Sequence, residues 1–203
     1  MAFSSTPTYA ELKTAIANWA KRADLSTYLD DVILMGEKWV FRNARTRDME
    51  TALNLSISSG VAAIPTDYVE MKHSYIDGTP VQSLQMRPAS WIYIQYPTRS
   101  AEGKPVYIGT EGSNFIFGPY ADSSYTLKGI YYKRLTSVAS SANALFTANP
   151  DLYLFAALAE LEPFLKNDKR IGLWTAKRAE ILAQVNGEDN DGNYGGLLTV
   201  RAA

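Results

Sequence analysis

The chain has 203 residues, of which 46% are hydrophobic and 20% charged, proportions that are ordinary for a globular protein. It contains no cysteine, which excludes disulfides, thiolate metal sites and a cysteine nucleophile. Its formal net charge is −1, which excludes binding of nucleic acid through a large overall positive charge.

The N-terminal quarter of the chain predicts two helices. Residues 1–8 are small and polar, so we predict no signal peptide. Thr8 and Glu11 have the spacing of a capping box, which predicts a helix that begins after Thr8. Ser26 is a candidate cap for a second helix, whose apolar residues recur with the helical period up to Val40. We therefore assign residues 1–50 to the N-terminal part of a helical core.

The period changes near Leu53, and residues 51–136 predict an inserted, mostly antiparallel β region. Asp77-Gly78 predicts a two-residue hairpin turn, and Pro80 places the strand that follows at a sheet edge. A second hairpin is predicted around Gly112. Residues 88–96 fit either a short helix or a strand.

The stretch that follows residue 148 predicts the central helix of the fold. Asn149 is a candidate N-cap, Pro150 suits the first helical position, and Asp151 places negative charge at the positive end of the helix dipole. The helix is apolar almost all round, which predicts packing on more than one side. With a last helix up to Val185, residues 137–186 form the C-terminal part of the helical core.

Residues 187–203 predict an extended C-terminal tail. Residues 187–196 are polar and glycine-rich, and apolar residues return afterwards. A five-residue strand is not stable alone, so we predict that this segment binds a partner. The predicted contacts come from Leu197, Leu198, Val200 and Arg201. The alternative is a frayed terminus without a role.

These elements predict an α+β fold: a bundle of about four helices with an inserted antiparallel β region and an extended C-terminal tail. No segment is long enough to cross a bilayer, so we predict no membrane contact.

No group of residues predicts catalysis or a cofactor. His73 is the only histidine and has no Ser or Asp pattern near it. Glu160 and Glu162 are two residues apart on a helix and point away from each other, unlike a glycosidase pair. An EF-hand alignment around Gly192 fails at the first and twelfth positions, which predicts a flexible acidic linker instead of a calcium loop.

One aromatic and basic run is a candidate nucleic-acid contact. Tyr131 and Tyr132 precede Lys133 and Arg134, a combination that can stack on bases and neutralise phosphates. The run is isolated in a near-neutral chain, which favours a strand end with one packed face.

Three segments nonetheless resemble a known family. They are TYAELK at residues 8–13, DLYLFAALAE followed by PFLKND within residues 151–168, and GGLLTVR at residues 195–201. Together they are similar to the head–tail adaptor, or connector, proteins of short-tailed bacteriophages, and the similarity spans nearly the whole chain. The segment at residues 151–168 is the most specific, and the β region is the least specific.

The resemblance implies a structural virion protein without catalytic residues. Such adaptors form a ring, usually of twelve copies, between the portal protein and the tail nozzle or tube. The ring extends the channel through which DNA passes without sequence-specific binding. The expected place is the portal vertex of the virion, after assembly in the host cytoplasm. Two other classes stay open: a virion-associated cell-wall hydrolase, and a glycan- or receptor-binding virion protein that uses the β region.

Overall fold

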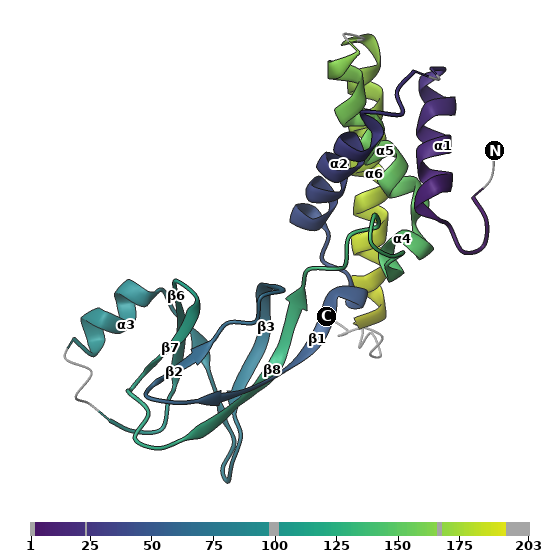
Figure 1. Ribbon diagram of the computed structural model, residues 1–203. Helices are drawn as coiled ribbons and strands as arrows, with labels where there is room; N and C mark the ends of the chain where they lie inside the picture. Colours follow the sequence, from purple (N-terminus) through teal and green to yellow (C-terminus); the bar gives the residue numbers. More distant parts are fainter. Residues whose placement is uncertain (1–2, 23, 98–101, 166–167, 194–203) are drawn as a thin grey trace, which may run out of the picture. The chain divides into compact units, whose positions relative to one another are not determined.

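The computed structural model describes residues 3–22, 24–97, 102–165 and 168–193, with side chains of the last range described from 169 to 187. The chain forms two compact units (Figure 1). Unit 1 combines Met1–Asp48 with Leu135–Ala203, and unit 2 is Met49–Arg134.

The expected numbers of helices and sheets were wrong. The described residues form six α-helices and two sheets of four strands each, not a bundle of about four helices with a single antiparallel β region. Two of the helices, α3 (Ala89–Gln95) and α4 (Ala144–Ala148), are too short to show a helical hydrophobic period. The pairing of strands into two sheets depends on contacts distant in the sequence, which local patterns do not contain.

Unit 1 is built around α5 (Pro150–Phe164), as predicted from a helix that is apolar almost all round (Figure 1). Leu152 to Ala159 are all buried, because neighbouring helices contact α5 on several sides. Those neighbours are α1 (Tyr9–Ala20), α2 (Leu29–Asn43), α4 and α6 (Asp168–Asn193).

The helices α2 and α5 approach each other closely at a glycine. A Cβ atom added to Gly36 would lie 2.8 Å from the backbone nitrogen of Ala157. Ala156 and Ala157 are fully buried at this contact. Small side chains on both helices therefore set the distance between the two backbones.

The helix caps were only partly predictable. The capping box of α1 is confirmed: Glu11 N donates to Thr8 Oγ1 at 3.2 Å, and Thr8 N donates to Glu11 Oε2 at 2.8 Å. Ser26 does not cap α2, which begins at Leu29 after a backbone turn closed by Leu25. Asn149 precedes α5 but makes no side-chain cap bond, because it also ends α4.

The connector that follows unit 2 is held on α2 by a buried carboxylate. Glu37 accepts hydrogen bonds from the Ser137 hydroxyl at 2.7 Å and from Val138 N at 2.8 Å. Asn143 accepts from Phe146 N at 2.8 Å and donates to Thr136 O at 2.8 Å. The polar side chains buried here are therefore used to fix the chain path.

Replacing Glu37 with alanine is expected to lower the free energy of unfolding by about 1.5–3 kcal/mol, since it leaves the buried Val138 N–H without an acceptor. Urea unfolding measures this loss. Glu180→Ala is the matched control, because Glu180 makes only an exposed ion pair with Lys177, and we expect a loss of about 0.5 kcal/mol or less. Equal losses in both variants would contradict the assigned role of Glu37.

Unit 2 contains two sheets. The first is antiparallel and has the order β1-β8-β3-β4. Its strands are β1 (Glu50–Ile57), β8 (Tyr125–Lys133), β3 (Tyr68–Ile76) and β4 (Gln82–Ser83). The second has the order β2-β7-β6-β5 and includes one parallel pair, β5 with β6. Its strands are β2 (Val61–Ala63), β7 (Asn114–Gly118), β6 (Tyr107–Glu111) and β5 (Gln85–Met86).

The two sheets of unit 2 share one hydrophobic core. Buried side chains of both sheets form this cluster, among them Leu53, Ile76, Ile108, Phe115 and Leu127. Unit 2 therefore has a core separate from the helical core of unit 1.

Turn predictions in unit 2 had mixed outcomes. Gly112 and Ser113 form the predicted tight turn between β6 and β7, and Gly112 supplies a positive φ of 56°. Asp77-Gly78 does not form a two-residue turn, because Ile76 pairs with Gln82 and five residues lie between them. The edge position predicted from Pro80 is correct, since β4 is the last strand of its sheet. The ambiguous residues 88–96 contain α3.

The helix α6 continues through Asn193, so the linker expected over residues 187–196 is helical in its first seven residues. Gly187 and Gly192 both lie in this stretch, and each costs a helix only about 1 kcal/mol relative to alanine. The preceding residues are anchored, since Val185 is buried and Asn186 Oδ1 accepts from Arg45 N at 3.1 Å. This anchoring holds the helix in place immediately before the stretch that carries the two glycines.

Candidate functional site

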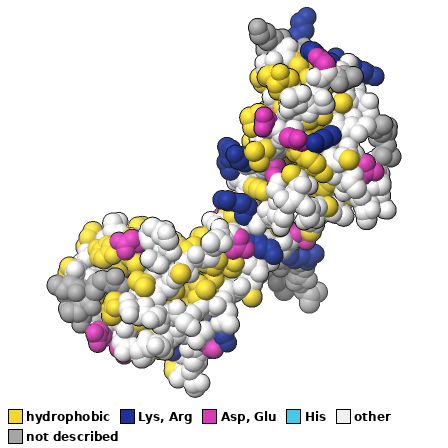
Figure 2. Space-filling model, in the orientation of Figure 1, with side chains coloured by type: hydrophobic (Ala, Val, Ile, Leu, Met, Phe, Trp, Pro, Cys, Tyr) yellow, Lys and Arg dark blue, Asp and Glu magenta, His cyan; other side chains and the backbone are white. Residues whose placement is uncertain are grey.

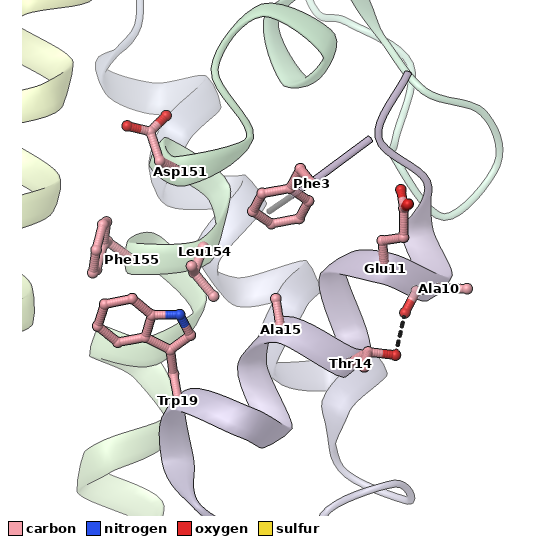
Figure 3. A pocket seen from close by; sticks show the side chains of 9 residues that line it. All are labelled: Phe3, Ala10, Glu11, Thr14, Ala15, Trp19, Asp151, Leu154 and Phe155. Atoms are coloured by element: carbon pink, nitrogen blue, oxygen red, sulfur yellow. Dashed lines mark hydrogen bonds between the residues drawn. The ribbon is translucent and has the colours of Figure 1, made fainter. Parts of the chain in front are cut away.

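One cavity of unit 1 lies between α1 and α5 and has a volume of about 480 Å³. Figure 3 shows its lining side chains, which come from both helices and from the segment before α1. The lining residues are Phe3, Ala10, Glu11, Thr14, Ala15, Trp19, Asp151, Leu154 and Phe155. We call this cavity the α1–α5 groove.

Aromatic rings form one wall of the groove (Figure 3). Trp19 lies edge-on to Phe155, with ring centroids 5.5 Å apart, and edge-on to Trp174 at 5.6 Å. The Trp174 indole donates to Glu162 Oε1 at 3.0 Å, which fixes the ring behind the wall. Trp19 is 45% exposed, so an apolar surface faces solvent at the groove.

Two carboxylates line the groove without any cationic side chain. Backbone N–H donation from Thr8, followed by the Ser4 hydroxyl, lowers the pKa of Glu11, so this carboxylate is ionised at neutral pH. Asp151 Oδ1 accepts from Leu152 N at 3.0 Å. Thr14 Oγ1 donates to Ala10 O at 2.9 Å and is thus satisfied within its own helix. The groove suits an apolar ligand that carries a positive charge.

A second cavity of unit 1, of about 430 Å³, is acidic but internally paired. Asp30 receives a hydrogen bond from Tyr9 Oη at 2.5 Å and lies 2.5 Å from Lys13 Nζ. Lys13, and then Tyr9, lower the pKa of Asp30, while burial and then Asp30 raise the pKa of Tyr9. Glu37, on the same wall, is already bound to the connector. The carboxylates of Asp30 and Glu37 are therefore already paired within the protein, so this cavity is a poorer candidate for a charged ligand.

The three side chains considered for catalysis, His73, Glu160 and Glu162, do not form a common site. His73 is exposed on β3, with its ring centroid 5.9 Å from that of Tyr75. Glu160 pairs with Arg178 at 2.7 Å, whereas Glu162 is 1% exposed and bonds to Trp174. Within the described ranges, no group of three or more His, Asp or Glu side chains could hold a metal ion.

The other two candidates are packed or helical. The backbone of residues 189–192 belongs to α6, so it forms neither a calcium loop nor the expected flexible linker. Tyr131 is buried, and its hydroxyl donates to Asp67 Oδ1 at 2.9 Å. Burial, with this hydrogen bond, raises the pKa of Tyr131 to about 12. Its ring is therefore unavailable for stacking on a base.

The four predicted partner-binding residues lie outside the described residues: Leu197, Leu198, Val200 and Arg201. Sequence reasoning missed the α1–α5 groove. The one available signal was the pair of small residues Ala10 and Thr14, one turn apart on the helix that carries Trp19. The opposite wall comes from residues more than 130 positions away, so this signal alone could not reveal a cavity.

The architecture defines a two-unit α+β protein, and the α1–α5 groove of unit 1 suits an apolar partner. A family model described as SU10 adaptor protein matches residues 7–201. The chain therefore belongs to the SU10 adaptor protein family, and the resemblance to phage head–tail adaptors is confirmed.

The name of the family indicates a phage adaptor, which is a structural protein of the virion. No curated protein matches the chain. Across the part of the chain that the structure describes, no helix is both long and apolar enough to span a membrane.

Proposed function

We propose that the protein is the head-to-tail adaptor that forms a ring between the portal protein and the tail nozzle and extends the DNA channel. The observation that carries this proposal is the family match over residues 7–201, which leaves only a few residues at either end unmatched. The portal, the nozzle or tube, and further copies of this chain are the partners.

The two-unit construction supports a ring component with more than one partner. Each unit buries its own hydrophobic side chains, so each can present a surface without depending on the core of the other. The head–tail adaptors that the chain resembles usually form rings of twelve copies, and twelve is the copy number we propose.

The charge distribution supports a channel through which DNA slides. The net charge is −1, and on the face shown in Figure 2 basic and acidic side chains are interspersed. A strongly basic wall would bind the phosphate backbone and hold the DNA in place. The proposed contact with DNA is therefore passage without sequence-specific binding.

Analytical ultracentrifugation of the chain alone and with the portal protein of its phage tests the proposal. We expect a monomer or weak oligomer alone and a ring on the portal, with cryo-electron microscopy giving the copy number. A stable closed dimer that the portal does not change would contradict the proposal.

A further inference from the structure

We infer that the α1–α5 groove is the binding site for residues 197–201 of a neighbouring copy of this chain. The inference rests on the proposed ring and adds the contact that joins one copy to the next. Its evidence is the groove, its charge, and the sequence of the C-terminal segment.

The groove has the size and surface of a site for a short apolar peptide. Its volume of about 480 Å³ falls within the range of about 300–1,000 Å³ typical of ligand pockets. Trp19, Leu154 and Phe155 supply apolar walls, and the small residues Ala10 and Ala15 leave the floor open (Figure 3). Covering Trp19 would remove a large exposed aromatic surface from water.

The C-terminal segment has matching apolar residues. Leu197 and Leu198 directly follow two glycines, and one polar residue, Thr199, separates them from Val200. Five extended residues span about 17 Å. Three aliphatic side chains of this size fit a site of the groove's volume, and their burial there removes apolar surface from water.

Charge complementarity gives the segment an orientation. Glu11 and Asp151 line the groove, and neither has an ion-pair partner among the described residues. Arg201 is the only charged side chain in residues 194–203. An arginine at the carboxylate end of the groove makes charge-assisted hydrogen bonds there, with the leucines toward Trp19.

The same pair of surfaces accounts for ring growth. Each copy carries one groove and one segment, so a segment placed in the next copy's groove makes a head-to-tail contact. Head-to-tail contacts generate rings when the rotation between copies closes. A segment folded back into its own groove would leave no such contact, which is why we assign the neighbouring copy as the donor.

A binding measurement tests the groove. A fluorescein-labelled peptide of residues 193–203 is titrated onto the full chain carrying Leu197→Asp and Leu198→Asp, which prevents the chain's own segment from competing. We expect the fluorescence anisotropy of the peptide to rise to a plateau as the chain is added. Thr14→Arg should lower the affinity for the peptide at least tenfold, and Met35→Arg should leave this affinity unchanged. Thr14 and Met35 are both exposed helical positions, and Met35 lies outside the groove. A peptide with Arg201→Asp should bind weakly and recover with Asp151→Arg.

Cross-linking tests whether the donor is a second copy. The chain has no cysteine, so Thr14→Cys and Leu198→Cys can be placed in separate chains and mixed on the portal. We expect a disulfide-linked dimer from this mixture and none when Met35→Cys replaces Thr14→Cys. Absence of saturable peptide binding, or an affinity unaffected by Thr14→Arg, would overturn the inference.

A disulfide that forms only within a chain carrying both cysteines would also overturn the inference. Rings that assemble at normal yield with Thr14→Arg would overturn it while leaving the proposed function intact. Absence of rings in the unsubstituted chain would instead count against the proposed function itself.

Discussion

Leu158→Ala is expected to lower the free energy of unfolding by about 2–5 kcal/mol, the usual range for truncating a buried leucine. Leu158 is 0% exposed and lies in the middle of α5, which α1, α2, α4 and α6 all contact. The substitution leaves a cavity inside the helical core, and the helices packed on α5 limit collapse into it. Guanidinium unfolding followed by circular dichroism gives the value.

The control for this experiment is Leu173→Ala on α6. Leu173 is 58% exposed, so its truncation creates no enclosed cavity and should change stability by about 0.5 kcal/mol or less. A loss below about 1 kcal/mol for Leu158→Ala would show that α5 is not the packed centre of unit 1.

Gly36→Ala is expected to destabilise the protein by about 1–3 kcal/mol, although alanine is the better helix former. The new Cβ would lie 2.8 Å from Ala157 N and 2.9 Å from the Ala156 carbonyl carbon. Both atoms belong to the backbone of α5, so relief requires moving one helix away from the other. Thermal unfolding would show the loss as a lower Tm.

Gly172→Ala provides the matched comparison. Gly172 also lies in a helix, but a Cβ there would meet no atom within 4 Å. With no clash to offset helix propensity, we expect a gain of up to about 1 kcal/mol. A gain in both variants would mean that α2 and α5 can separate without cost, and the close approach at Gly36 would lose its structural importance.

Features that depend on a few adjacent residues were predictable from the sequence. The capping box of α1 needs only Thr8 and Glu11, and the turn at Gly112 needs only one residue with positive φ. The burial of α5 was also predictable, because a helix without a polar face must be covered on several sides.

Features that depend on a second segment of chain were not predictable. Ser26 can cap a helix, but α2 begins later, after a backbone turn closed by Leu25. Asn149 can also cap a helix, but its backbone ends the preceding helix α4. Asp77-Gly78 has the residues of a tight turn, yet the register of β3 with β4 requires a longer loop. Division of the strands into two sheets likewise follows from long-range pairing.

The candidate site shows the same limit. Glu11 was identified for its capping role and Asp151 for its place at a helix start, and both were predicted at their helix positions. Their position on one groove depends on the packing of α1 against α5, which brings together residues about 140 positions apart. The partner-binding role of the C-terminal segment stays a prediction.

The pairing of β1 with β8 makes unit 2 an exchangeable module. The chain enters this unit on β1 and leaves it on β8, and Glu50 lies opposite Tyr132 in an antiparallel ladder. Facing residues in such a ladder have Cα atoms about 5 Å apart, so the two ends of the insert are adjacent. A β module from a related adaptor could thus be grafted between residues 48 and 135 with its core intact.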